Sequence, residues 1–115
     1  MRTRVLVIAE GSDRDALMEW LQLAGFIAKG SSPADCQLQA SRYQPDVVIV
    51  DVQVAYDVSR VLRAIDQVSP QTHVIVITAR PGHVHAERAR VTCLTKPVDL
   101  RRLQKLLLES QRIAV

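Results

Sequence analysis

The sequence predicts a single α/β domain, a three-layer αβα sandwich in which helices cover both faces of a five-stranded parallel sheet. Three short runs of consecutive aliphatic residues support this prediction most strongly, because strands buried on both faces of a parallel sheet show no polar alternation. These runs are residues 5–9, 47–50 and 74–77. Segments whose apolar residues recur at helical spacing separate them. The 115 residues of the chain, 1–115, suffice for one domain with one sizeable core.

The first strand, residues 5–9, is followed by a helix with recognisable ends. Ser12 is expected as its N-cap, and Asp15 three residues later completes a capping-box-like pair. Apolar residues at helical spacing then continue as far as Gly25, which is expected to close the helix. Residues 26–29 form the second predicted strand.

The second helix is expected to begin at Ser32-Pro33, with Pro33 in the first helical position and Asp35 three residues after Ser32. It runs to about Tyr43. The central strand follows at residues 47–51 and ends on the carboxylate of Asp51.

The second half of the chain continues the alternation with a helix, a strand, a shortened fourth helix, a strand and a final helix. We expect these elements at residues 58–68, 74–77, 83–90, 91–94 and 100–107. Ser69-Pro70 ends the first of these helices, and Arg80-Pro81-Gly82 is a turn signal. Right-handed crossovers leave few topologies for this order of elements, and the flavodoxin-like strand order 2-1-3-4-5 is the one we expect.

Composition points to an ordinary globular domain of the cytoplasm. The apolar fraction is 48%, and no segment approaches the ~20 apolar residues of a membrane span. Cys36 and Cys93 have no motif spacing, which favours two reduced thiols over a disulfide. The formal charge of +3 is spread along the chain, so it permits a nucleic-acid partner without indicating one.

Four polar residues stand where the predicted long strands end: Glu10, Asp51, Thr78 and Lys96. Parallel strands place all their carboxyl ends at one edge of the sheet, where ligands bind in open α/β folds. Two acids could hold a hard cation such as Mg²⁺, and a hydroxyl and an ammonium could contact phosphoryl oxygens.

The motifs that carry these residues resemble a known signature. Pro45-Asp46, Asp51, Thr78-Ala79 and Lys96-Pro97, in this order and on these strands, are similar to the signature of CheY-like receiver domains of two-component response regulators. The resemblance covers nearly the whole chain and implies a phosphoprotein of phosphorelay signal transduction. Such a domain switches a partner or an output domain.

The resemblance implies a role for each strand-end residue. Asp51 would accept a phosphoryl group from a sensor histidine kinase. Glu10, Asp51 and the main-chain carbonyl of Gln53 would hold Mg²⁺. Thr78 and Lys96 would be the catalytic contacts to the phosphoryl oxygens.

The sequence also departs from the family pattern. Ala9-Glu10 stands where two adjacent acids are usual, Val54-Ala55 where Met-Pro is usual, and Ser59 where Gly is usual. Cys93 replaces the aromatic switch residue. The segment from Thr78 to Lys96 is about one helical turn short, taking ~3.6 residues per turn. These departures leave an alternative open, in which the chain is an unphosphorylated pseudo-receiver acting as a constitutive protein-interaction module.

Plainer structural interpretations stay open for the same residues. Asp51 could cap the next turn, Glu10 could be a solvated turn residue, and Thr78 could be a strand terminus. Two histidines spaced i and i+2, His83 and His85, are more often plain surface than metal ligands, so we do not expect a metal site there.

An enzyme is not expected, because the chain has no Gly-rich phosphate loop and no recognisable catalytic constellation. The final helix carries a basic surface that predicts either a solvated face or a contact with an effector domain or a second copy. Its residues are Arg101, Arg102, Lys105 and Arg112. Direct nucleic-acid binding is not expected there, because aromatic residues and a binding motif are missing.

Overall fold

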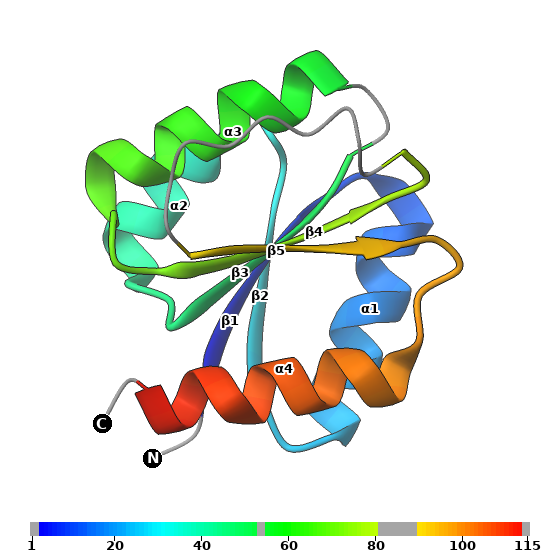
Figure 1. The fold of residues 1–115 in the computed structure, drawn as a ribbon. Helices are drawn as coiled ribbons and strands as arrows, with labels where there is room; N and C mark the ends of the chain where they lie inside the picture. Colours follow the sequence, from blue (N-terminus) through cyan, green and yellow to red (C-terminus); the bar gives the residue numbers. More distant parts are fainter. Residues whose placement is uncertain (1–2, 53–54, 81–89, 114–115) are drawn as a thin grey trace.

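The computed structural model of the chain describes residues 3–52, 55–80 and 90–113. Strands and helices alternate as far as residue 78, and a further strand and a final helix follow among the described residues (Figure 1). The strands are β1 (Arg4–Ala9), β2 (Ile27–Ser31), β3 (Val47–Asp51), β4 (His73–Thr78) and β5 (Val91–Thr95). The helices are α1 (Gly11–Leu23), α2 (Cys36–Tyr43), α3 (Ala55–Val68) and α4 (Leu100–Ile113). The short helix predicted at residues 83–90 falls, apart from Arg90, outside the described residues.

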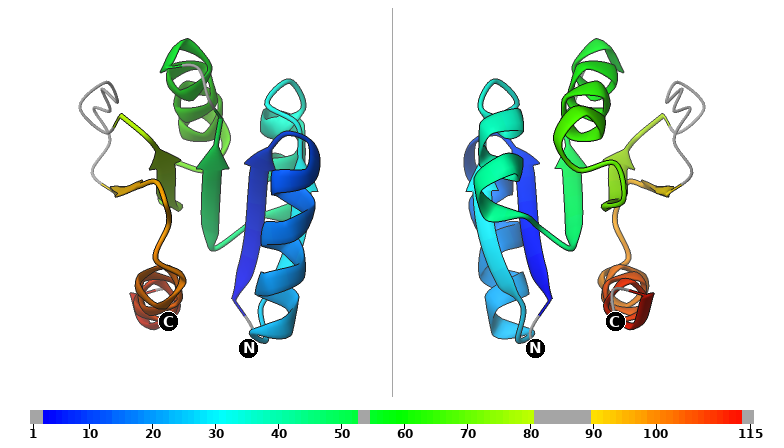
Figure 2. Two further views of the ribbon diagram at one scale, coloured as in Figure 1. Left: turned by 90° about the vertical axis from the view of Figure 1, so that its right-hand side faces the viewer. Right: turned by 90° about the vertical axis from the view of Figure 1, so that its left-hand side faces the viewer.

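The five strands form one parallel sheet in the order β2-β1-β3-β4-β5, which confirms the predicted topology. Helices α2 and α3 cover one face of the sheet, and α1 and α4 cover the other (Figure 1). The arrowheads of β1, β3 and β4 point to the same edge (Figure 2). The carboxyl ends of the strands therefore meet there, as the sequence predicted.

The buried apolar residues of the described chain form two clusters, one on each face of the sheet. In β3 the side chains alternate between them, since successive residues of a strand point to opposite faces. Val48 and Val50 join the cluster under α2 and α3, whereas Val47 and Ile49 join the cluster under α1 and α4. All four are completely buried. This alternation also decides on which face each residue at the end of a strand lies.

The start of α1 differs from the prediction. The helix begins at Gly11 with Glu10 in the N-cap position, and Ser12 lies inside its first turn without acting as the cap. Pairing of β1 with β3 continues to Ala9, opposite Asp51, so the chain turns into the helix immediately after the strand. A side-chain cap is worth only about 1 kcal/mol, too little to override that geometry.

The start of α2 was also predicted too early. Ser32 and Asp35 do bond to each other, since the Asp35 N–H donates to Ser32 Oγ at 3.3 Å and the Ser32 hydroxyl donates to Asp35 Oδ2 at 3.3 Å. These bonds close a turn that precedes the helix, which begins at Cys36. The reason is that β2 extends to Ser31, two residues beyond its predicted end at Lys29, so residues 32–35 serve as the connection.

Gly25 ends α1 as predicted and provides a test of the helix terminus. Its φ is +96°, and the N–H groups of Gly25 and Phe26 donate to the carbonyls of Gln22 and Leu21 at 3.1 and 3.0 Å. No atom lies within 4 Å of a Cβ placed there, so the cost of a side chain is conformational. We expect Gly25→Ala to lower the free energy of unfolding by about 1–2 kcal/mol in a urea titration. The control is Gly25→Asn, which should lose less because Asn tolerates a left-handed backbone; equal losses would contradict this explanation.

Candidate functional site

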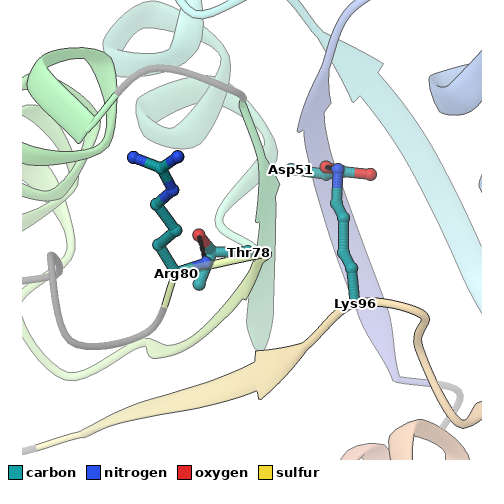
Figure 3. Close-up of polar contacts among 4 residues, drawn as sticks. All are labelled: Asp51, Thr78, Arg80 and Lys96. Carbon is teal, nitrogen blue, oxygen red and sulfur yellow. Dashed lines mark hydrogen bonds and ion pairs between the residues drawn. The ribbon is translucent and has the colours of Figure 1, made fainter.

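Asp51 and Lys96 form an ion pair at the carboxyl edge of the sheet. The Lys96 Nζ lies 2.7 Å from Asp51 Oδ1 (Figure 3). The Asp51 side chain is 14% exposed and that of Lys96 33% exposed, so the pair is largely screened from water while remaining reachable. The structure therefore brings together two of the four residues that the sequence predicted to meet.

Strand alternation explains how this pair forms. Asp51 follows Val47 and Ile49 on its strand and shares their face, which is the one covered by α1 and α4. Lys96 stands two residues after Leu94 of the same cluster, so it leaves β5 on that face as well. Strand β4 lies between β3 and β5. The long lysine side chain is therefore needed to reach Asp51 across the end of the intervening strand.

Thr78 ends β4 and makes a different contact. Its hydroxyl oxygen accepts a hydrogen bond from the Arg80 backbone N–H at 3.1 Å. Thr78 lies on the same face of the sheet as Val74 and Val76, which belong to the cluster under α2 and α3. In Figure 3 its side chain lies on the Arg80 side, turned away from the Asp51–Lys96 pair. The structure does not bring this predicted phosphoryl contact to the pair.

Glu10 is exposed. It follows Leu6 and Ile8 at intervals of two residues, and both belong to the cluster under α2 and α3, so Glu10 lies on that side of the sheet as well. It lines a cavity of about 270 Å³ together with Ser32 and with Arg60 of α3. Asp51 lines a different cavity. The expected pairing of Glu10 with Asp51 is therefore not assembled in this structure.

The cavity at Asp51 is a groove of about 680 Å³ between α1 and the segment that leads into α4. Sequence reasoning missed one of its acids, Asp13, in the first turn of α1. The signal was available, because Asp13, Leu17 and Trp20 are spaced i, i+4 and i+7 and so share one helix face. Asp13 and Asp51 are the carboxylates that line this groove within the described part of the chain.

The Mg²⁺ site that the resemblance implies would have Glu10, Asp51 and the main-chain carbonyl of Gln53 as its ligands. Within residues 3–52, 55–80 and 90–113, no group of three or more His, Cys, Asp or Glu side chains could hold a metal ion. Asp51 is already bonded to an ammonium, and Glu10 lines the other cavity. Gln53, His83 and His85 lie outside the described residues.

Both cysteines are free thiols, in agreement with the sequence prediction. Cys36 of α2 is buried and Cys93 of β5 is partly exposed; burial raises the pKa of each thiol above its usual value. Cys93 packs against the cluster under α2 and α3. The residue at the expected aromatic position therefore lies on the face opposite Lys96.

Helix α4 is basic on its outer side, where Arg101, Arg102 and Lys105 are exposed. The side chain of Arg112 lies outside the described set. Among the described helices, none is both long enough and apolar enough to cross a membrane.

Solved structures with this fold include bacterial receiver domains. A CheY-like response regulator receiver domain from Methylobacillus flagellatus is 18% identical, with a TM-score of 0.74 over 96% of this chain and 99% of that one. The chemotaxis protein CheY4 of Vibrio cholerae is 19% identical, with a TM-score of 0.74 over 96% and 99%. A protein described as a transiently phosphorylated switch in bacterial signal transduction is 24% identical, with a TM-score of 0.75 over 96% and 98%. No protein-family model matches the sequence, and no curated protein matches it. The likeness to CheY-like receiver domains is thus established for the fold.

Proposed function

We propose that this chain is a receiver-type signalling domain in which Asp51 accepts a phosphoryl group. The observation that supports this most strongly is the 2.7 Å contact between Asp51 and Lys96 at the carboxyl edge of the central strand. That edge is where open α/β sheets bind ligands. The arrangement offers a nucleophilic carboxylate and, beside it, a cation suited to phosphoryl oxygens. The fold shared with bacterial receiver domains is consistent with it.

The donor that this chemistry fits is the phosphohistidine of a sensor histidine kinase in the cytoplasm. A carboxylate oxygen of Asp51 attacks the phosphorus atom, so that an O–P bond forms and the P–N bond to the imidazole breaks. The imidazole nitrogen leaves with the electron pair and remains in the kinase. Lys96 stabilises the charge on the phosphoryl oxygens during transfer.

Phosphorylation would alter the contact of Lys96. A phosphoryl group brings close to two negative charges and strong acceptor oxygens to Asp51. The Lys96 ammonium would then bond to a phosphoryl oxygen instead of Asp51 Oδ1. Lys96 directly precedes the segment that leads into α4, whose outer side is basic. We propose that α4 carries the signal to an effector domain or to a second copy of the chain.

A second candidate is the pseudo-receiver, in which the fold is a constitutive interaction module without phosphorylation. The positions of Glu10 and Thr78 favour it, because both lie on the side of the sheet away from Asp51. In this alternative the Lys96 ammonium serves only to neutralise a largely buried carboxylate.

Incubation with acetyl phosphate separates these candidates. The resemblance implies Mg²⁺, so the reaction mixture contains it. A mass increase of one phosphoryl group on the wild-type protein is the result expected of a phosphoacceptor. An unchanged intact mass would favour the pseudo-receiver.

A further inference from the structure

The groove beside Asp51 has the size and composition of a small-molecule site. Its volume of about 680 Å³ lies within the range of roughly 300–1,000 Å³ that is usual for such pockets. One wall is a face of α1, and the opposite wall is the segment that enters α4. Its lining includes Asp13, Leu17 and Trp20 of α1, the Asp51–Lys96 pair, and Val98 of the segment before α4.

The walls of the groove are apolar and continuous with the core. Leu17, Trp20 and Val98 are partly buried and pack against the cluster under α1 and α4. Leu100 at the rim is 40% exposed. A ligand with an apolar body would cover this surface.

The charged groups of the groove favour one sign of ligand charge. Among the described residues, two carboxylates and one ammonium line it, which together carry one net negative charge. Lys96 is bonded to Asp51, so the carboxylate that remains for a ligand is that of Asp13. Asp13 and Trp20 share a face of α1 about two helical turns apart, roughly 10 Å at 1.5 Å per residue. A cation could therefore meet Asp13 while its apolar body lies along Leu17 towards the indole ring.

We propose that this groove binds a small amphiphilic organic cation, with its ammonium group at Asp13 and its apolar body against Leu17, Trp20 and Val98. The indole ring can also attract a cation through its π face. An anionic ligand of the same shape would face the Asp13 carboxylate and be disfavoured. Because Asp51 lines the same groove, a bound cation would cover the acceptor carboxylate and slow its phosphorylation; this consequence rests on the proposed function.

The binding test uses phenethylamine as the probe, with hydrocinnamate as an anion of similar shape and phenethyl alcohol as a neutral one. Trp20 is the only tryptophan of the chain, so its fluorescence reports on the groove directly. We expect phenethylamine to bind roughly fivefold or more tightly than hydrocinnamate, a difference of about 1 kcal/mol. Equal affinities, or no saturable change with the amine, would overturn the proposal.

Two matched variants locate the cation. Asp13 is exposed, so Asp13→Asn removes the charge without disturbing the core, and we expect it to abolish the preference for the amine. Asp15→Asn changes an exposed carboxylate of the same helix that lines a different cavity, and it should retain the preference. A preference that survives Asp13→Asn, or that is lost in Asp15→Asn, would contradict the assigned position.

Ligand binding and phosphorylation are measured in separate experiments. The fluorescence titration needs no phosphoryl donor, so its failure contradicts the groove proposal and leaves the role of Asp51 intact. Conversely, a protein that binds the amine but is never labelled by acetyl phosphate supports the groove and contradicts the phosphoacceptor.

Discussion

The Asp51→Asn variant is expected to take up no phosphoryl group from acetyl phosphate under conditions in which the wild-type protein takes up one. Asn has nearly the same shape as Asp, but its amide cannot act as the nucleophile that attacks phosphorus. Asp51 is only 14% exposed and contacts Lys96, so the isosteric change keeps the packing of the site. Intact mass spectrometry after the incubation measures the result.

The matched control for this experiment is Asp15→Asn. It makes the same chemical change at an exposed carboxylate of α1 that lines another cavity, so labelling should equal that of the wild type. Labelling of Asp51→Asn at the wild-type level would show that another residue is the acceptor. Absence of labelling in the wild-type protein would instead favour the pseudo-receiver.

Replacing Lys96 with Met should both slow phosphorylation and destabilise the fold. Loss of a preorganised charge that contacts transferring oxygens costs about a hundredfold in rate in comparable sites. The same change leaves the mostly buried carboxylate of Asp51 without its ammonium, which costs about 1–3 kcal/mol in free energy of unfolding. Labelling time courses and urea titrations measure the two effects.

Replacing Asp51 with Asn should lower the free energy of unfolding less than replacing Lys96 with Met. The Lys96 side chain is 33% exposed, so its ammonium can turn towards water in Asp51→Asn. The Asp51 side chain is only 14% exposed, so its carboxylate cannot do the same in Lys96→Met. Lys105→Met, at an exposed position of α4, controls for the loss of a lysine and should alter neither readout. A Lys96→Met protein that is labelled at the wild-type rate would remove Lys96 from the proposed mechanism.

Much of the fold could be predicted because its strongest signals are local. The aliphatic run at residues 47–50 is typical of a strand buried on both faces, and the structure shows all four residues completely buried. The helix starts could not be placed as well. Ser12 and Ser32 both have the chemistry of an N-cap, but the lengths of β1 and β2 decide where the chain turns. Strand length depends on pairing with neighbours that are distant in sequence.

The candidate site shows a sharper limit. The end of each strand was correctly placed at one edge, but that edge has two sides. Alternation along the strands assigns Asp51 and Lys96 to the side of α1 and α4, and Glu10 and Thr78 to the side of α2 and α3. This sorting could have been inferred from the sequence by counting back to the buried residues of each strand. The closure of the Asp51–Lys96 contact could not, because it depends on the spacing of three strands and on the reach of one side chain.

The most direct test of the account is a double-mutant cycle between Asp51 and Lys96. The free energy of unfolding is measured for the wild type, Asp51→Asn, Lys96→Met and the double variant. If the two side chains form the ion pair seen at the sheet edge, the coupling energy should be about 1 kcal/mol or more. A coupling energy near zero, with the two single changes adding independently, would contradict the ion pair on which the proposed function depends.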